Sequence, residues 1–279
     1  MIKKKELPID WLICPFSKEE LYLKDNKLYS SSSCYSNTQG FWDFLFEQQL
    51  DFSDTDLWEM WNELQKNGEV SYLSDPEANL AIGPLKEFVD FAEFSVFRGN
   101  ILDIGVGPQK LPTHMEHSNN DEAFFVGLDP LVGSQPRDFT FVRALGEYLP
   151  FKNEIFDQVL FVTSLDHFID PRDALEEAKR VMKKDGELLV VMGEKSEFAP
   201  RPAQNPQWYE SLQVPKGADD KFHYKKFGTK EFQSFLRDVE LEIVELHRQP
   251  VRDWADAIHD KIDLSGPIWG ESLFYRISK

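Results

Sequence analysis

The sequence predicts an α/β fold built on a mostly parallel sheet. From residue 101 onward, short apolar runs typical of buried strands alternate with turns and helical segments. The first of these strands, Ile101–Ile104, leads directly into Gly105-Val106-Gly107. Glycines in such a turn let the backbone bend sharply and let a ligand approach closely. We therefore expect a ligand site at the carboxyl end of this strand.

The length of 279 residues allows one large α/β domain with a smaller segment beside it. No stretch approaches the roughly 18 apolar residues that a membrane helix needs, so we expect no membrane partner. The basic N-terminus has no apolar run behind it, and the chain has only two cysteines. Both features are typical of a cytoplasmic protein. The oligomeric state is left open.

The formal net charge is −18, and the excess of acidic residues lies mainly after residue 50. A protein that binds a phosphate backbone usually presents a basic face. No block dense in Lys and Arg occurs here. The composition therefore argues against a nucleic-acid partner.

Residues 1–50 are predicted to form a small β-rich segment of their own. Cys14-Pro15, a serine-rich turn and Cys34 precede a strand that starts at Gly40. This order resembles the zinc ribbon found at the N-terminus of some bacterial enzymes. A structural zinc site needs four nitrogen or sulfur ligands, whereas the other ligand positions hold Ser17 and either Ser31 or Asn37. We expect a metal-free relic, held by the packing of Trp11, Phe16, Tyr22, Phe41 and Trp42.

Residues 51–100 are predicted to be mostly helical. Asp54-Thr55-Asp56 suits the start of a helix over 57–64, and Gly83-Pro84 suits the start of a second helix. Trp58 and Trp61 of the first helix belong either to a core or to the wall of a substrate pocket.

The remaining elements follow the strand-turn-helix order. A helix starting at Asp170-Pro171 is expected to end at Lys183–Gly186, with basic residues in its last turn. A short helix is expected over 229–236. The further strands are predicted at 124–129, 139–144, 156–162, 186–192, 241–246 and 272–277.

Residues 193–228 interrupt this order. The segment contains four prolines together with Trp208 and Tyr209, which indicates a long irregular insertion. Long insertions in compact domains are often functional. We expect a wall or lid on the substrate side, and a surface excursion or dimer contact is the alternative.

The residue that distinguishes the glycine turn is Asp103, two positions before Gly105. A carboxylate there would repel a pyrophosphate and suits a ligand with an amino group. Asp103-x-Gly105-x-Gly107 resembles the first motif of class I S-adenosylmethionine (SAM)-dependent methyltransferases, although Gln109 replaces the third glycine. The segments at 147–151, 156–159 and 165–171 resemble the UbiE-like branch (methyltransferase type 11) at the right spacing.

The resemblance implies a Rossmann-like seven-stranded sheet in the order 3-2-1-4-5-7-6, with only the last strand antiparallel. It also implies a methyltransferase domain over 51–279 with SAM as cofactor. Asp103 and the turn would lie near the methionine part, and Asp129 would bind the ribose hydroxyls. The cofactor-binding residues predicted in this way are Asp103, Gly105, Gly107, Asp129, Pro130, Leu145, Gly146, Glu147, Thr163 and Ser164.

Candidates for a catalytic base follow the fourth strand. We select His167 over Ser164 and Asp166, while an orienting role at a helix entrance remains the alternative reading of His167. His223 and Tyr224 are further candidates beyond the insertion. No metal ligands are expected.

The function predicted is methyl transfer from SAM to a small-molecule or carrier-bound metabolite. One alternative is an rRNA base methyltransferase, because zinc-ribbon-headed enzymes of similar layout modify rRNA. Another is a non-catalytic binding or regulatory protein, since Gln109 and Leu145 depart from the family pattern and prolines interrupt 109–118, where a long helix is expected. An NAD-dependent oxidoreductase is disfavoured by Asp103.

Overall fold

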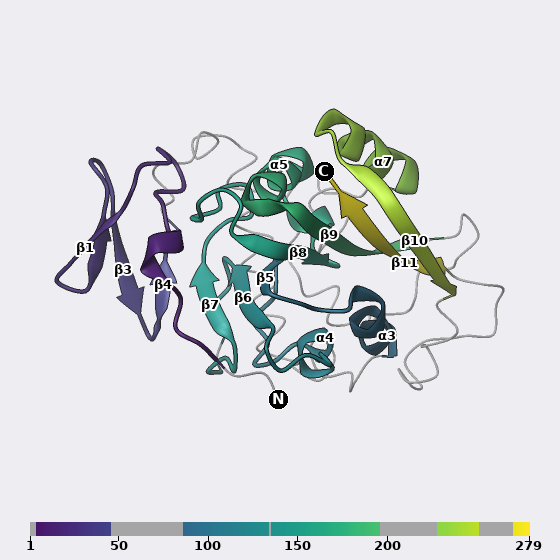
Figure 1. The fold of residues 1–279 in the computed structure, drawn as a ribbon, viewed down its shortest axis with the longest axis horizontal. Coiled ribbons are helices and arrows are strands. Elements are labelled where there is room, and N and C mark those ends of the chain that lie inside the picture. The colour runs from purple at the N-terminus through teal and green to yellow at the C-terminus, as the bar shows by residue number, and fades with distance from the viewer. Residues whose placement is uncertain (1–3, 46–85, 134, 196–227, 251–269) are drawn as a thin grey trace, which may run out of the picture.

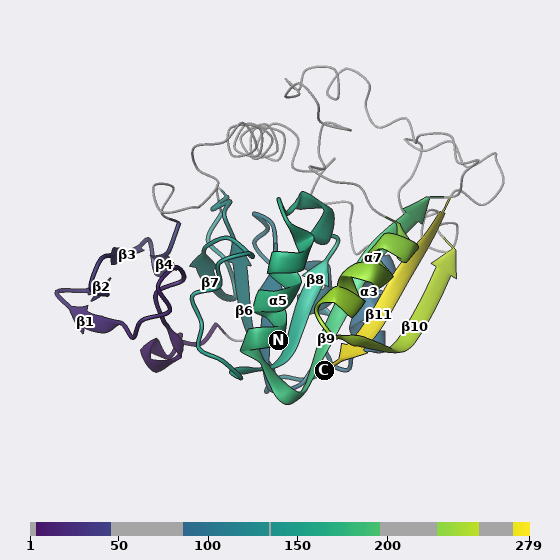
Figure 2. The same cartoon turned by 90° about the horizontal axis from the view of Figure 1, so that it is seen from above.

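The computed structural model describes residues 4–45, 86–133, 135–195, 228–250 and 270–279. One mixed sheet of eleven strands runs through them in the order β1-β2-β3-β4-β7-β6-β5-β8-β9-β11-β10. Helices cover both faces of the sheet (Figure 1). In Figure 2, the arrows of β6, β7 and β8 point in one direction along the strands, and the arrow of β11 points in the opposite direction. None of the helices in this part of the chain combines the length and apolar character that a membrane span requires.

Seven of these strands form the predicted central sheet. In their own chain order they lie as 3-2-1-4-5-7-6, and β11 pairs antiparallel with both β9 and β10. The predicted fold class and order are thus confirmed for this part. The strands are β5 (Asn100–Ile104), β6 (Phe124–Asp129), β7 (Thr140–Arg143), β8 (Phe156–Val162), β9 (Met182–Lys195), β10 (Glu242–Pro250) and β11 (Gly270–Ser278).

The N-terminal residues 4–45, here called the N-terminal module, continue the same sheet. Its strands are β1 (Tyr22–Lys24), β2 (Lys27–Tyr29), β3 (Cys34–Thr38) and β4 (Phe41–Asp43), preceded by a 3-10 turn, η1 (Ile9–Trp11). β4 pairs in parallel with β7, so the sheet has eleven strands rather than seven. The module differs from the expected separate appendage because Cys14, Tyr35 and Trp42 share one core cluster with the central sheet.

Two apolar layers hold the helices on the sheet. α5 (Pro171–Val181) and α7 (Thr229–Asp238) share the core cluster that contains Leu102 and Val126. α3 (Lys86–Ser95) and α4 (Thr113–Glu116) cover the other face, where Phe91 and Met115 pack with Ile101 and Phe125. Alternate residues of each strand therefore feed different layers.

Some element boundaries differ from the sequence prediction. α5 begins as predicted, with Asp170 accepting a hydrogen bond from the backbone N–H of Arg172, but it ends at Val181. The next residue, Met182, is fully buried and pairs with Phe156. The register shifts between Met182 and Glu187, so Lys183 and Lys184 lie in an irregular part of the strand. Burial of Met182 in the sheet thus outweighs the helix-ending signals further along. In 109–118, where a proline interrupts the long helix of the family pattern, the structure has only the four residues of α4.

Several predictions fall on residues outside the described ranges. These are the helix with Trp58 and Trp61, most of the insertion at 193–228, and the residues His223 and Tyr224. Within that insertion only 193–195, the last residues of β9, and Gly228, the N-cap residue of α7, are described.

Candidate functional site

Asp103 of β5 is fully buried and has two different oxygen environments. Its Oδ2 lies 2.8 Å from Nε2 of His114 on α4. Its Oδ1 is buried and accepts no hydrogen bond from any residue in the described ranges. A buried carboxylate oxygen without a donor is costly, and such groups in native proteins call for an explanation. A ligand that brings a donor, such as an amino group, provides one.

The glycine turn after β5 is fixed by its contacts as well as by its backbone angles. Gly105 has φ +78°, and a Cβ on it would lie 2.5 Å from Cβ of Ser164. Gly107 has φ +73°, and its N–H donates to Oδ2 of Asp129 at 2.7 Å. The first glycine is therefore required by the neighbouring strand tip, while the second connects the turn to β6.

Asp129 ends β6 with both of its carboxylate oxygens hydrogen-bonded. Oδ1 accepts from the backbone N–H of Leu131 at 2.8 Å, and Oδ2 accepts from Gly107. Burial raises the pKa of Asp129 to about 6, against the two amides and Arg137, which lower it. The group is therefore mainly ionised at neutral pH, and each oxygen keeps acceptor capacity for a further donor.

The loop after β7 contributes apolar contacts and a third buried carboxyl. Leu145 packs with Phe16 of the N-terminal module, and a Cβ on Gly146 would lie 2.3 Å from the ring of Phe168. Glu147 accepts the N–H of Ile169 at 2.9 Å, and burial raises its pKa to about 7. Glu147 thus connects this loop to the segment before α5.

The tip of β8 combines backbone strain with an accessible imidazole. Thr163 is exposed and has φ +55°, a left-handed conformation that β-branched residues rarely adopt and that is common at functional sites. Ser164 is buried, and its Oγ donates to the carbonyl of Ile104 at 2.7 Å. His167 ends the 3-10 turn η3 (Leu165–His167) and is half-buried, with Nε2 3.9 Å from Oδ1 of Asp166. Of these residues, Thr163 is exposed and His167 is half-buried, whereas Ser164 is buried.

The predicted residues are thereby brought to the adjoining tips of β5, β6, β7 and β8. Pro130 belongs to the same region, and its carbonyl accepts from Nε of Arg143 at 3.0 Å. Sequence reasoning missed His114 and Arg137, two buried residues that contact this region. Neither stands in a recognisable pattern, because each finds its partners only through the fold.

The ribbon-like part of the N-terminal module contains a hydrogen-bonded thiol. Sγ of Cys14 lies 3.1 Å from Oη of Tyr35 and accepts the N–H of Ser17 at 3.5 Å. Cys14 and Cys34 are both free thiols. Across the described ranges, no three His, Cys, Asp or Glu side chains are grouped closely enough to hold a metal ion. That the module folds without metal stays a prediction, which elemental analysis of the purified protein tests.

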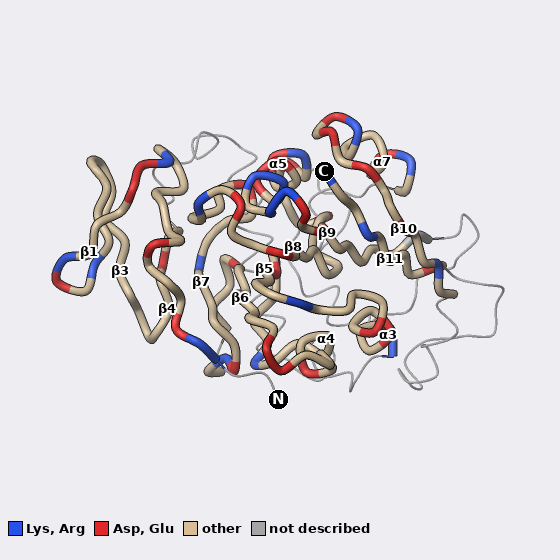
Figure 3. Tube along the Cα trace, in the orientation of Figure 1, with Lys and Arg blue, Asp and Glu red and all other residues tan. Residues whose placement is uncertain are grey.

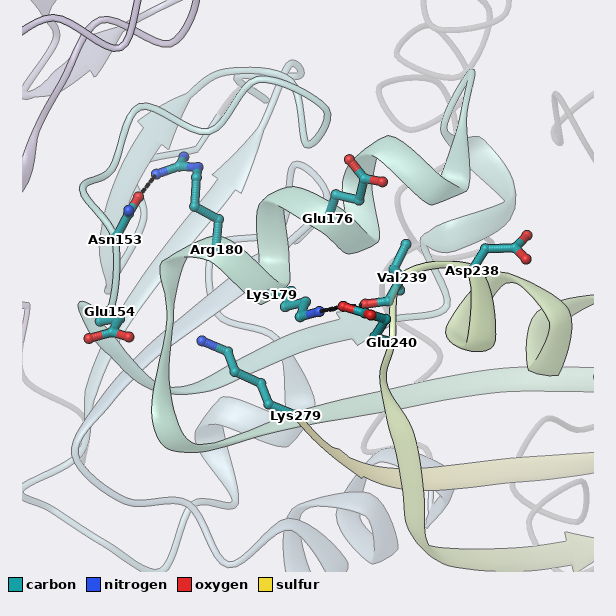
Figure 4. A pocket seen from close by; sticks show the side chains of 9 residues that line it. All are labelled: Asn153, Glu154, Glu176, Lys179, Arg180, Asp238, Val239, Glu240 and Lys279. Carbon is teal, nitrogen blue, oxygen red and sulfur yellow. Dashed lines mark hydrogen bonds and ion pairs between the residues drawn. The ribbon is translucent and has the colours of Figure 1, made fainter.

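A hollow of about 670 Å³ lies at the amino ends of the parallel strands (Figure 4). It is bounded by α5, by Val239 and Glu240 after α7, and by the C-terminal Lys279. Its walls carry both signs of charge. Lys179 pairs with Glu240 at 3.3 Å, and Arg180 donates to Asn153 at 3.0 Å. The hollow lies at the opposite ends of the strands from the predicted site, and none of the predicted site residues lines it.

Comparison with known proteins agrees with this geometry. Residues 102–190 match the family model described as methyltransferase domain. An uncharacterised protein of Methanocaldococcus jannaschii is 37% identical over 101 residues, which cover 36% of this chain and 48% of that protein. The ubiquinone/menaquinone biosynthesis C-methyltransferase of Wigglesworthia glossinidia brevipalpis is 28% identical over 103 residues, 33% of this chain and 41% of that protein. The chain thus spans less than half the length of these curated relatives.

A solved structure shares the fold. The 1,6-didemethyltoxoflavin-N1-methyltransferase of Burkholderia thailandensis, which has S-adenosylhomocysteine bound, superposes with a TM-score of 0.53 at 12% identity. The match covers 91% of this chain and all of that one. Residues 102–190 thus match a methyltransferase domain, and the chain shares its fold with a methyltransferase that has S-adenosylhomocysteine bound. These two findings imply SAM as the cofactor.

Proposed function

We propose that this protein transfers a methyl group from SAM to a small-molecule or carrier-bound metabolite. The observation that carries the proposal is Oδ1 of Asp103, which is buried beside the glycine turn and has no hydrogen-bond donor among the described residues. An ammonium group would supply the missing hydrogen bond and neutralise the carboxylate. SAM has such a group on its methionine part.

Asp129 is proposed to hold the ribose hydroxyls. Its two oxygens already orient the glycine turn and the loop after β6, so the carboxylate is fixed in place before ligand arrives. Leu145 and Gly146 are proposed to line the adenine side, with Pro130 and Glu147 supporting that wall. The carboxylate of Asp103 beside the glycine turn also disfavours a pyrophosphate, which argues against NAD.

The chemistry requires little from the protein beyond alignment. Bound SAM supplies an electrophilic methyl group, so the site must hold the acceptor in line and exclude water. His167 is proposed to take the acceptor's proton where the acceptor has one to lose, because its imidazole is partly accessible at the β8 tip. Thr163 and Ser164 are proposed to form the adjoining wall.

Charge supports a metabolite rather than RNA as the acceptor. The chain has a formal net charge of −18, and Lys and Arg in its described part lie among Asp and Glu (Figure 3). The Wigglesworthia relative is named as a C-methyltransferase of ubiquinone/menaquinone biosynthesis, which also supports a small acceptor. We further propose a cytoplasmic location, in keeping with the cysteine content.

Two measurements test the proposal. Calorimetry should show binding of S-adenosylhomocysteine and negligible binding of NAD, and the reverse preference would refute the cofactor assignment. Tritiated SAM should then label a small-molecule extract and leave total RNA unlabelled. Label in RNA would favour the rRNA alternative, and cofactor binding without labelling of either fraction would favour a non-catalytic protein.

The role of His167 has its own test. With a labelled acceptor fraction, His167→Ala should lower turnover by about tenfold or more, since a positioned base typically contributes 10²–10⁴-fold. Its affinity for S-adenosylhomocysteine should stay within about twofold, because the imidazole is proposed to act on the acceptor. His247→Ala is the matched control, as His247 packs on Phe274 at the β10–β11 edge. Equal turnover in both variants would assign His167 an orienting role only.

A further inference from the structure

Arg137 is a buried cation in the loop between β6 and β7. Arg137 is only 7% exposed, and arginine is almost never so fully buried unless its charge is paired. Burial lowers its pKa to about 10, with Asp129 acting in the opposite direction. The guanidinium therefore remains charged at neutral pH.

The guanidinium makes four hydrogen bonds to backbone carbonyls in two separate loops. Nη1 donates to Gly107 at 2.6 Å and to Gln109 at 3.2 Å, both in the turn after β5. Nη2 donates to Leu131 at 2.9 Å and to Val132 at 3.1 Å, both in the loop after β6. One planar group thus fixes the distance between the two loops.

The plane of the guanidinium is held from one side by an aromatic ring. Its Cζ lies 3.8 Å from the ring centroid of Phe141 on β7, within the range of a cation–π contact. Phe141 is a buried residue of the central sheet. The position of Arg137 is therefore set by the rigid strands and passed on to the loops.

The two loops need such an external support because their own secondary structure is sparse. After Gly107 no helix begins until Thr113, and α4 then lasts only four residues. Among the described residues between β6 and β7, none is helical. Gly107 is instead held on both sides, with its N–H on Asp129 and its carbonyl on Arg137.

We propose that Arg137 is a positioning residue for the cofactor, clamping the glycine turn and the loop after β6 in the arrangement that binding requires. The proposal rests on the proposed function, since it assigns the two loops to SAM. Arg137 itself contacts carbonyls and an aromatic ring, and it acts through Gly107 and Asp129. A lysine at this position would keep the charge and lose the planar fork.

The test compares Arg137→Met and Arg137→Lys with the wild-type protein. Arg172→Met is the matched control, because Arg172 also stacks on an aromatic ring. Its Cζ lies 4.6 Å from the ring centroid of Phe235, and its side chain pairs with Asp238 of α7. Calorimetry with S-adenosylhomocysteine is carried out well below each variant's unfolding temperature. Hydrogen exchange by NMR follows the amides of Gly107 and Leu131 and those of β8 and β9.

We expect Arg137→Met to bind S-adenosylhomocysteine about tenfold more weakly or worse, with Arg137→Lys in between. Arg172→Met should bind within about twofold of wild type. In Arg137→Met the Gly107 and Leu131 amides should exchange faster while amides of β8 and β9 keep their protection. A purely structural role would raise exchange in all of these strands together.

The proposal is overturned if folded Arg137→Met binds within twofold of wild type, or if its exchange rises equally throughout the sheet. If Arg137→Met does not fold, the same two readouts on Arg137→Lys decide the matter. Failure of the wild-type protein to bind S-adenosylhomocysteine would instead refute the proposed function. The loop amides in the unliganded variants would still show whether Arg137 clamps the two loops.

Discussion

The N-terminal module and the tips of β5 and β6 both contain buried polar groups, but the hydrogen bonds of these groups are satisfied to different extents. In the module, the thiol of Cys14 meets the Tyr35 hydroxyl and the Ser17 amide within the chain itself. At the strand tips, one buried oxygen of Asp103 has no hydrogen-bond partner within the part of the chain that the structure describes. The polar groups of the module are satisfied by the chain itself, whereas the unsatisfied oxygen of Asp103 calls for an explanation, which a bound ligand would supply.

The two regions are nevertheless joined mechanically. Phe16 of the module packs against Leu145 and lies 5.3 Å, centroid to centroid, from the ring of Tyr148. Lys18 pairs with Glu177 of α5 at 2.8 Å, and Asp43 pairs with Arg143 of β7 at 3.0 Å. The module therefore supports the loop after β7 from outside, although it carries no residue of the predicted cofactor set.

The largest effect is expected from removing the incomplete group. Asp103→Asn keeps the shape and loses the charge, so affinity for S-adenosylhomocysteine should fall by about 3 kcal/mol, or about 100-fold. Asp43→Asn, the matched change in the module, should leave affinity unchanged. Calorimetry at one pH and salt concentration measures the dissociation constant of each variant. An unaltered constant for Asp103→Asn would show that the buried oxygen of Asp103 does not bind the cofactor.

A somewhat smaller loss is expected at Asp129. Asp129→Ala removes the proposed ribose contacts and frees the Gly107 and Leu131 amides, which should cost about 1.5–3 kcal/mol of binding. The measurement is again calorimetric titration with S-adenosylhomocysteine. Equal affinity in Asp129→Ala and wild type would assign Asp129 to loop structure alone.

The buried carboxyl of Glu147 should make stability depend on pH. Burial raises its pKa from 4.5 to about 7, so its favourable contribution is fully present below pH 4.5 and is lost as pH rises through 7. Glu147→Gln keeps an acceptor for Ile169 and has no charge to bury. Between pH 4.5 and pH 9 the variant should therefore gain about 2 kcal/mol of unfolding free energy relative to wild type, measured by urea denaturation.

Glu177 of α5, which pairs with Lys18 of the module, supplies the control of opposite sign. Against the effect of burial, Arg180 and Lys18 lower the pKa of Glu177. Its contribution is present above the ordinary carboxyl pKa and lost as pH falls through the lowered value. Glu177→Gln should therefore be less stable than wild type at pH 7, with the gap closing in acid. A Glu147→Gln profile parallel to that of Glu177→Gln would contradict the assigned pKa direction.

The smallest effect on binding is expected from the module's own cluster. Cys14→Ala leaves the Tyr35 hydroxyl without its thiol partner and opens a small gap, which should cost about 1–2 kcal/mol of unfolding free energy. Affinity for S-adenosylhomocysteine should stay within twofold, and Cys14→Ser should recover part of the stability. A tenfold loss of affinity in a folded Cys14→Ala would show that the module belongs to the site.

Local signals were enough to predict most of the central fold. Apolar runs with polar tips gave the strands, and Asp170-Pro171 gave the start of α5. The resemblance supplied the strand order, which the pairing of β11 with β9 confirms. The end of α5 was predicted wrongly because the helix-ending signals after Val181 are local, whereas burial of Met182 in the sheet is a tertiary effect.

By itself the sequence determined the class of fold, the glycine turn and the carboxylates Asp103 and Asp129, because each follows from short-range pattern and chemistry. Only the tertiary structure decided that β4 extends the sheet along β7, that His114 meets Asp103, and that Arg137 clamps two loops. β4 and β7 are about a hundred residues apart, and the Arg137 carbonyls lie on two separate loops. Such contacts follow no sequence period, since they form only when the sheet brings the strand tips together.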